Sequence, residues 1–306
     1  MQVIGGGALG SLVAARLVRA GVEACLVLRP GSRKEALCLG KRTVSVVVEE
    51  VGKDSISVEV PLCRNVVGRC VVCTKAFDAA AAVGSRASTL LLGNGVLALR
   101  DSLPGAVSAT TTHGCYEIEP FRVMHAGSGR LWMDAASEEG AAFFEDFEGA
   151  NLNAVPLSTE DMDDRLWSKL AANCVLNPLT ALFACRNGEA LNSEDRRAQA
   201  RTLCEEIANL RRRKRREERN IEKQPDDDKD TLYEDVLDCA RENANNFSSM
   251  YQDLKHNRRT EIDFLNGWIA QEGDRLGVPT PANARLCAEI KQRESQLGLH
   301  TASPSP

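Results

Sequence analysis

Features that would mark a membrane, nucleic-acid or metal-binding protein are missing from this sequence. Its 306 residues contain no run of 18 apolar residues, so we expect no membrane-spanning helix. The formal net charge of −5 gives no general attraction to nucleic acid or to anionic membranes. Histidine is scarce, and no metal-ligand spacing links His113, His125, His256 and His300. We therefore predict no metal site, no nucleic-acid partner and no membrane partner.

The eleven cysteines are an odd number, scattered along mostly apolar stretches such as residues 24–27 around Cys25. This distribution is typical of small buried side chains in a reducing compartment rather than of a disulfide framework. Because the first strand is expected at the first residues, we predict no signal peptide and a cytoplasmic protein. Cys70 and Cys73 have CxxC spacing, but residues three apart in a strand point to opposite faces. A redox or metal role for this pair is therefore only the alternative.

The start of the chain has the pattern strand, glycine turn, helix, strand. Apolar residues 1–4 precede a glycine-rich turn, a helical pattern runs to Ala20, and residues 22–28 are apolar and β-branched. Further short apolar runs alternate with alanine-rich or polar segments, at Thr43–Val48, Val66–Cys73, Thr89–Leu92 and Val107–Thr111. This alternation predicts an α/β domain built on a doubly wound parallel sheet of the Rossmann type.

From about Thr159 the strand-like runs disappear, and helical periodicity continues to about Gln296. We therefore predict a Rossmann domain over residues 1–158, an all-α domain over residues 159–300 and a disordered tail over residues 301–306. A charged block lies inside the helical part, where Arg211–Arg216 is followed by the acidic run Asp226–Asp228. We interpret the block as a solvated helix extension and loop, with a nuclear-localisation or nucleic-acid patch as the alternative.

The glycine turn has the spacing of a dinucleotide-binding loop. Gly5 permits the tight turn, Gly7 allows a pyrophosphate to approach the backbone, and Gly10 allows close packing of the helix. The N-terminus of that helix, at Ala8 and Leu9, would face the phosphates. The motif is weak by itself, so its place between a strand and a helix supports the prediction. A glycine turn without a ligand is the alternative.

The end of the second predicted strand indicates which dinucleotide is bound. An NAD site would usually have Asp or Glu here, whereas this chain has Arg29, Arg33 and Lys34. Arg29, with Arg33 or Lys34, would pair with a 2′-phosphate, so we predict NADPH/NADP as the cofactor. Ordinary exposed basic residues are the alternative. Lys75 and Asn94 follow later strands, where carboxyl ends line a ligand crevice, although Asn-Gly is also a favoured turn.

Lys169, Asn173 and Asn177 stand four residues apart among residues that belong in a core. At about 3.6 residues per turn, this spacing puts all three on one helix face, here called the Lys169–Asn177 stripe. Buried polar groups are costly unless they find partners, so the stripe indicates a site for a polar, anionic ligand with a carbonyl or hydroxyl group. Pro178 cannot continue a regular helix without a kink, and we expect it to bend the chain away from the stripe.

A second polar cluster lies within residues 246–267. Ser249, Asp253 and Glu261 fall at steps of four and eight residues, roughly one helical face. The alternative is that Asp253 and Glu261 are only solvated charges on an exposed face. Asn187, directly before Gly188, suits a helix end.

These stretches resemble the 2-dehydropantoate 2-reductases, also called ketopantoate reductases. The resemblance spans nearly the whole chain, and its specific parts are residues 169–189 and 246–267, with the glycine turn and, more loosely, Asn94 and Thr110–His113. It implies a Rossmann domain followed by an all-helical domain like that of 6-phosphogluconate dehydrogenase. It also implies an enzyme of pantothenate biosynthesis that reduces the keto acid ketopantoate to pantoate with NADPH.

The resemblance implies roles for single residues as well. Lys169 matches a catalytic lysine that polarises the ketone and delivers a proton, and Glu261 matches its acidic partner. The positions that match substrate-binding residues are Asn94, Asn173, Asn177, Asn187 and Ser249. The positions that match cofactor-binding residues are Gly5, Gly7, Ala8, Leu9, Gly10, Arg29, Lys75 and Asn94. The physical chemistry agrees, since ketone reduction builds negative charge on oxygen and a positioned cation stabilises it.

The chain departs from the family pattern in three places. The first strand is very short, the stretch between Lys75 and Asn94 is shortened, and the charged block at residues 211–230 resembles an insertion. Two other functions are therefore kept as alternatives: a reductase of another small 2-keto acid on the same fold, and a non-catalytic NADP(H)-binding protein. We expect a monomer or homodimer whose partner is the small-molecule keto acid.

Overall fold

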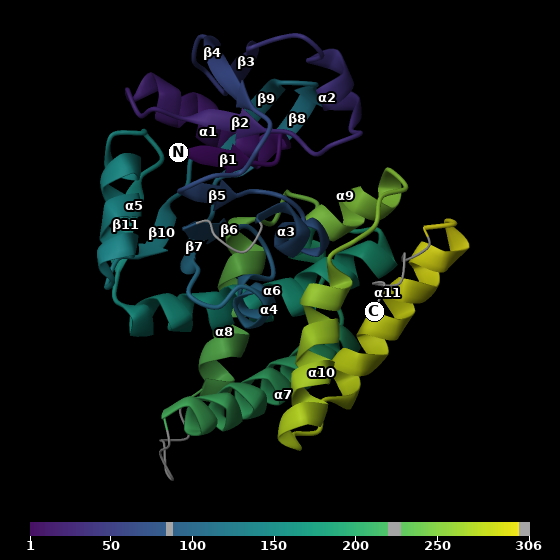
Figure 1. Ribbon diagram of the computed structural model, residues 1–306. Coiled ribbons are helices and arrows are strands. Elements are labelled where there is room, and N and C mark those ends of the chain that lie inside the picture. Colours follow the sequence, from purple (N-terminus) through teal and green to yellow (C-terminus); the bar gives the residue numbers. More distant parts are fainter. Residues whose placement is uncertain (84–87, 220–227, 300–306) are drawn as a thin grey trace. The chain divides into compact units, whose positions relative to one another are not determined.

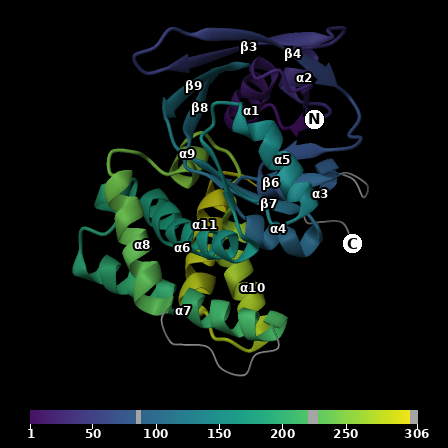
Figure 2. The ribbon, with the colours of Figure 1, turned by 90° about the vertical axis from the view of Figure 1, so that its left-hand side faces the viewer.

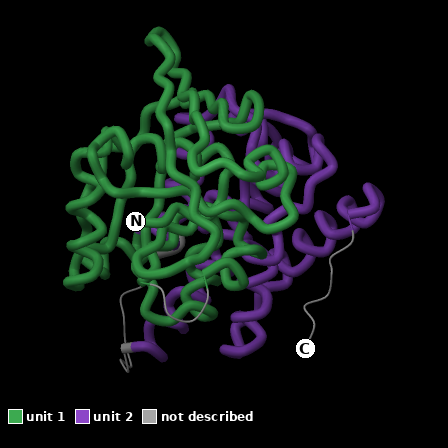
Figure 3. The backbone as a smooth tube through the Cα atoms, turned by 45° about the horizontal axis from the view of Figure 1, so that its top comes forward, with its two compact units in different colours: residues 1–164 green, residues 165–306 purple. Residues whose placement is uncertain are grey.

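The computed structural model describes residues 1–83, 88–219 and 228–299 (Figure 1). The chain divides into two compact units, Met1–Asp164 and Arg165–Pro306 (Figure 3). The predicted disordered tail at 301–306 lies outside the described residues, as do residues 226 and 227 of the acidic run.

The first unit alternates strands with helices along the chain. Its elements are β1 (Gln2–Ile4), α1 (Ala8–Arg19), β2 (Cys25–Val27), α2 (Arg33–Leu37), β3 (Thr43–Glu50), β4 (Ile56–Cys63), β5 (Cys70–Val72), α3 (Ala76–Val83), β6 (Thr89–Leu92), α4 (Val96–Ser102), β7 (Val107–Thr111), β8 (Gly114–Glu119), β9 (Arg122–Gly127), β10 (Leu131–Asp134), α5 (Glu138–Glu148) and β11 (Ala154–Leu157). The predicted runs at Thr89–Leu92 and Val107–Thr111 are strands with those bounds.

The strands form one sheet in the order β11-β10-β7-β6-β5-β1-β2-β4-β3-β9-β8. The neighbouring strands β3 and β4 lie side by side in Figure 2. Strands β7, β6, β5, β1, β2 and β4 pair in parallel, which confirms the Rossmann-type prediction for this part. The sheet is mixed, however, because β3 with β4, β8 with β9, and β10 with β7 are antiparallel. Short turns join β3 to β4 and β8 to β9, and such connections favour antiparallel pairing.

Helix α1 buries its apolar side against this sheet. Leu12, Val13 and Leu17 have no exposed surface, and α1 contacts β3 and β4 as well as the strands on either side of it in the chain. The helix also contacts β8 and β9, which lie far away in the sequence. The hairpin β8–β9 is therefore packed beside the helix that follows the glycine turn.

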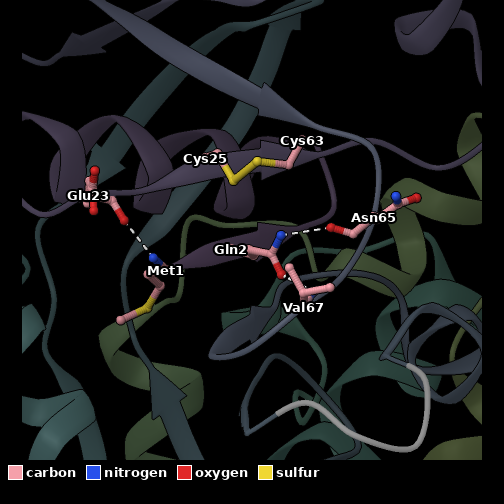
Figure 4. Close-up of a disulfide and its surroundings, with 7 residues drawn as sticks. All are labelled: Met1, Gln2, Glu23, Cys25, Cys63, Asn65 and Val67. Carbon is pink, nitrogen blue, oxygen red and sulfur yellow. Dashed lines mark hydrogen bonds between the residues drawn. A yellow bond between two sulfur atoms is a disulfide. The ribbon is translucent and has the colours of Figure 1, made fainter.

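A covalent link joins two neighbouring strands of the sheet. Cys25 on β2 and Cys63 on β4 form a disulfide, shown in Figure 4. Parallel pairing of β2 with β4 brings their Cα atoms to 6.0 Å, a separation that a disulfide can span. The prediction that Cys25 is a reduced buried side chain is therefore wrong. All eleven cysteines lie in the described residues, and the other nine, including Cys70 and Cys73, are free thiols.

The second unit is helical in its described residues. Its elements are α6 (Thr159–Phe183), which begins in the first unit, η1 (Asn187–Glu189), α7 (Glu194–Arg219), α8 (Asp228–Glu242), α9 (Ser249–Lys255), η2 (Ile262–Phe264), α10 (Asn266–Leu276) and α11 (Pro281–Gln296). Two tryptophan rings, of Trp167 on α6 and Trp268 on α10, pack with their centroids 5.7 Å apart.

The basic block at Arg211–Arg216 lies in α7, and part of it faces α10. The Nζ atom of Lys214 is 3.1 Å from the Glu272 carboxylate, and Arg211 is buried. Arg275 on α10 lies 2.8 Å from the carboxylate of Glu217 on α7. The interpretation of this block as a solvated extension is therefore wrong for Arg211 and Lys214, because ion pairs and packing join the two helices here.

Candidate active site

The Lys169–Asn177 stripe lies on a single helix, as its spacing predicted. Lys169, Asn173 and Asn177 all belong to α6, which is continuous from Thr159 to Phe183. Lys169 and Asn173 are partly buried, and Asn177 is buried. One cation and two amides therefore share a helix whose other residues in this stretch belong to the core.

Pro178 does not interrupt α6, which continues to Phe183. Proline lacks the N–H group that would bond to the carbonyl four residues earlier, which is that of Cys174. This carbonyl instead accepts a hydrogen bond from the Nδ2 atom of Asn266, at 2.9 Å. Helix α6 thus continues past the proline because a side chain at the start of α10 replaces the missing backbone donor, and the bend expected at Pro178 stays a prediction.

Asn266 is itself part of a buried polar chain. Its Nδ2 atom also donates to Oδ1 of Asn283, at 2.9 Å, and the Nδ2 atom of Asn283 donates to Glu206, at 2.8 Å. The same Glu206 carboxylate accepts the backbone N–H groups of Ala282 and Asn283 at the start of α11. Hydrogen bonds therefore connect the helix with the stripe to α10, α11 and α7.

The surroundings of Lys169 suit proton transfer near neutral pH. Burial lowers the pKa of its ammonium group to about 8, Glu261 and Cys239 oppose the shift by raising the pKa, and Arg165 lowers it. A lysine with a pKa near the operating pH can carry a charge and also give up a proton. The fold thus brings Lys169 and the Glu261 carboxylate within electrostatic reach of each other, although they are far apart in the sequence.

Glu261 stands in a short loop segment outside α9. Helix α9 ends at Lys255, and Glu261 directly precedes η2, so the expected helical face shared with Ser249 and Asp253 is wrong. The alternative of solvated charges is also wrong, because Asp253 and Glu261 are only 3% and 6% exposed. Helix α11 fixes this loop through Glu294, which accepts the backbone N–H of Thr260 at 2.6 Å.

Asn187 and Ser249 lie in different settings. Asn187 begins η1 rather than ending a helix, so the helix-end interpretation is wrong. Its backbone N–H donates to the carbonyl of Asn246 at 2.9 Å, while its buried Oδ1 atom has no hydrogen-bond partner among the described residues. Ser249 is exposed at the start of α9. The preceding residue, Ser248, caps α9 and accepts a hydrogen bond from Thr180 of α6 at 2.6 Å.

The glycine turn of the first unit has the geometry that its spacing predicted. Gly5 has φ of +107°, a conformation that side chains disfavour. A Cβ atom at Gly10 would lie 1.8 Å from the carbonyl oxygen of Gly5, so only glycine allows this approach of helix and turn. A Cβ atom at Gly7 would meet nothing within 4 Å, which leaves room in front of α1.

These features fit a dinucleotide. Gly7 precedes α1 without any side-chain cap, so the first N–H groups of the helix, from Ala8 onward, remain available to phosphate oxygens. Thr74, which the sequence did not single out, follows β5 and has its methyl group 3.0 Å from the ideal Cβ position of Gly5. Its buried Oγ1 atom has no hydrogen-bond partner among the described residues. An unpaired hydroxyl beside the turn is a signal that only the folded chain provides.

The other predicted cofactor residues follow the carboxyl ends of parallel strands. Lys75 comes after β5 and Asn94 after β6, two neighbouring strands of the sheet. Both side chains are partly buried. Gly95, which follows Asn94, has φ of +69° and precedes α4, so the Asn-Gly pair also makes the turn. Arg29 follows β2 and is 67% exposed.

Comparison with known proteins agrees with both units. The family model described as "Ketopantoate reductase PanE/ApbA" matches residues 1–138, and "Ketopantoate reductase PanE/ApbA C terminal" matches residues 161–294. The 2-dehydropantoate 2-reductase of Pyrobaculum aerophilum is 30% identical over 299 residues, which cover 96% of this chain and 98% of that protein. The chain belongs to the ketopantoate reductase family. This family consists of oxidoreductases that act on CH–OH groups.

Solved structures share the fold of this ketopantoate reductase family member. A PanE/ApbA family ketopantoate reductase from Ralstonia eutropha JMP134 is 28% identical with a TM-score of 0.77, and the match covers 97% of this chain and 100% of that one. A ternary structure of D-mandelate dehydrogenase with NADH and anilino(oxo)acetate has a TM-score of 0.80 at 21% identity, covering 98% and 100% of the two chains.

The part of the chain that the structure describes contains neither a metal-binding cluster nor a membrane-spanning helix. Within them, no group of three or more His, Cys, Asp or Glu side chains could hold a metal ion. No described helix is both long and apolar enough to cross a membrane.

Proposed function

We propose that this chain is an NADPH-dependent 2-dehydropantoate 2-reductase, which converts ketopantoate to (R)-pantoate in pantothenate and coenzyme A biosynthesis. The observation that supports this most is the pair of Lys169, with a pKa of about 8, and the buried Glu261 carboxylate beside it. A cation that can release its proton, held by an acidic partner, is what reduction of a ketone requires.

When bound, NADPH would supply a hydride to C2 of the keto acid. The electron pair of the C=O bond moves to the oxygen, and the ammonium group of Lys169 stabilises this charge and transfers its proton there. Glu261 holds the lysine, or a substrate hydroxyl, in position. Lys169 becomes neutral in this step, which its lowered pKa makes easier, and it takes up a proton again from solvent.

The remaining polar residues of the stripe would bind the substrate. Asn173 and Asn177 offer amide donors and acceptors on the same helix as Lys169, one and two turns further along. The unpaired Oδ1 atom of Asn187 is a further acceptor for a substrate hydroxyl. Asn94 and Ser249 complete the proposed substrate-binding set.

The cofactor would be bound by the first unit. The glycine turn and the start of α1 would take the pyrophosphate, with Gly5, Gly7, Ala8, Leu9 and Gly10 as the residues involved. Lys75 and Asn94 would bind the nicotinamide end, and Arg29 would pair with the 2′-phosphate of NADP.

The test is NADPH oxidation with ketopantoate, measured for the wild type and for Lys169→Met. We expect the variant to lose turnover by at least about a thousandfold, because it loses both the cation and the proton donor. NADPH binding, followed by cofactor fluorescence, should persist in the variant. Lys53→Met, which removes an exposed lysine from the turn after β3, is the matched control and should keep full activity. Full activity of Lys169→Met would refute the proposed role.

A second candidate is reduction of another small 2-keto acid. The fold is shared with a D-mandelate dehydrogenase, and the stripe supplies polarity without defining the shape of the substrate. A panel of 2-keto acids of graded size, including the keto acid of mandelate, separates the two by kcat/KM. NADPH binding without turnover of any member would instead indicate a non-catalytic protein. The same panel run with NADH tests the cofactor, since a strong NADH preference would refute the role of Arg29.

A further inference from the structure

Two cations that follow β2 are each paired with a carboxylate from another element of the first unit. The Nη1 atom of Arg29 lies 3.2 Å from Oδ2 of Asp78 on α3. Lys34 on α2 forms an ion pair with Glu117 on β8 and donates to the carbonyl oxygen of Gly6 in the glycine turn. The basic residues at the proposed 2′-phosphate position are thus already neutralised by acidic side chains.

Lys34 is held against the glycine turn. Its side chain is 17% exposed, compared with 67% for Arg29. Its Nζ atom lies 5.2 Å from the centroid of the Phe121 ring, and its Cδ atom is 3.6 Å from the ideal Cβ position of Gly6. The aliphatic part of Lys34 therefore packs on the turn, and its charge is positioned beside the start of α1.

Glu117 reaches Lys34 because the hairpin β8–β9 packs on α1. Helix α1 contacts both strands of the hairpin, and α2 and β8 lie side by side in Figure 1. Glu117 is 33% exposed, so solvent and ligands can reach its carboxylate. The carboxylate of Glu117 therefore lies against the ammonium group of Lys34, one of the cations that the sequence suggests for the 2′-phosphate.

We propose that Lys34, together with Arg29, binds the 2′-phosphate of the cofactor, and that Glu117 and Asp78 are counter-ions that this phosphate displaces. The inference rests on the use of NADP(H) in the proposed function. A phosphate carries more charge than a carboxylate and offers three acceptor oxygens, so it can replace Glu117 on Lys34. A ribose hydroxyl cannot do so, but a carboxylate can accept a hydrogen bond from it. Glu117 and Asp78 therefore reduce the preference for NADP over NAD.

The experiment compares binding of 2′,5′-ADP and 5′-ADP, which differ only in the 2′-phosphate, to the whole chain by calorimetry. We expect Lys34→Met to weaken 2′,5′-ADP by about tenfold or more, the effect of one lost charge-assisted hydrogen bond, and to change 5′-ADP by less than about twofold. Glu117→Gln should tighten 2′,5′-ADP by about three- to tenfold, since a competing charge is removed. Met keeps the packing of the Lys34 stem on Phe121.

Two variants serve as matched controls. Lys41→Met removes an exposed cation that follows α2, and Glu119→Gln removes a carboxylate of β8 that pairs with Arg122. Both should leave the ratio of the two affinities within about twofold of wild type. A large loss in Lys41→Met with none in Lys34→Met would overturn the proposal, as would equal effects on both ligands.

The outcome also separates this inference from the proposed function. If the wild type binds 5′-ADP with the same affinity as 2′,5′-ADP, the assignment of NADP as the cofactor itself fails. If wild type prefers 2′,5′-ADP, and Lys34→Met and Glu117→Gln keep the same preference, only the role of the Lys34–Glu117 pair is refuted. If Lys34→Met does not fold, the affinity of the Glu117→Gln variant for 2′,5′-ADP still tests the role of the pair.

Discussion

Removing the side chain of Asn266 tests whether this amide allows α6 to continue through Pro178. Asn266 has no exposed surface, and its Nδ2 atom serves the carbonyl of Cys174 and the Oδ1 atom of Asn283, both at 2.9 Å. In Asn266→Ala both acceptors lose their donor inside the protein. A buried acceptor left unsatisfied costs about 1–3 kcal/mol, so the variant should lose about 2–6 kcal/mol of unfolding free energy.

The contribution of the helix can be isolated in a double-mutant cycle with Pro178→Ala. Alanine restores the N–H group that bonds to the Cys174 carbonyl, so in that background Asn266→Ala leaves only Asn283 unsatisfied. We expect Asn266→Ala to cost about 1–3 kcal/mol less in the Pro178→Ala background than in the wild type. The control background is Pro156→Ala, a proline of β11 in the other unit, where the cost of Asn266→Ala should be unchanged.

The assay is urea unfolding followed by tryptophan fluorescence. Trp167 and Trp268 both lie in the second unit, so a Trp132→Phe background makes the signal report on that unit alone. This choice matters because two units can unfold separately, and a global signal would mix their transitions. Additive effects of Asn266→Ala and Pro178→Ala, within about 0.5 kcal/mol, would refute the compensation of the proline by the amide.

Three further perturbations test other parts of the structure. Replacing Cys25 and Cys63 by serine should lower the unfolding free energy of the oxidised protein by about 4 kcal/mol, which is the chain-entropy value for a separation of 38 residues. If the variant and the wild type unfold at the same urea concentration without reductant, the disulfide is contradicted. Burial lowers the pKa of His125 from 6.5 to about 4. Between these two pH values, the unfolded chain therefore binds a proton that the folded chain does not. Stability should therefore be lost as pH falls from about 6.5 to 4, by about 3 kcal/mol, and His125→Gln should lack this part of the acid dependence in melts at graded pH. The rate of keto acid reduction should fall as pH rises through about 8, where Lys169 loses its proton. Glu261→Gln should move this fall in rate to lower pH, because the Glu261 carboxylate raises the pKa of Lys169. An unchanged pH profile in Glu261→Gln would contradict the pairing of Lys169 with Glu261.

Much of the fold was predictable because its signals are local. The glycine turn, the strands at Thr89–Leu92 and Val107–Thr111, and the change to helices after Thr159 follow from spacing and periodicity within a few residues. Strand pairs between segments that are distant in the sequence were not predictable in the same way. The pairing of β3 with β9 joins segments far apart in the chain, and no short-range pattern records such a partner.

The candidate site shows the same division. The positions of Lys169, Asn173 and Asn177 on one helix followed from helical geometry alone. The placement of Glu261 did not, since the assumed helix ends at Lys255 and the residue reaches Lys169 from a loop held by α11. Thr74 was missed because a lone threonine after a strand has no distinctive pattern.

By itself the sequence determined which residues share a turn or a helix face, because φ preferences and the helical repeat act between neighbours in the chain. The tertiary structure decided which charges and amides meet across the fold. Asn266 compensates for Pro178, Glu117 neutralises Lys34 and Cys63 bonds to Cys25 only because packing brings separate elements within contact distance. The burial that lowers the pKa of Lys169 has the same origin, since the side chain loses water only when other helices cover it.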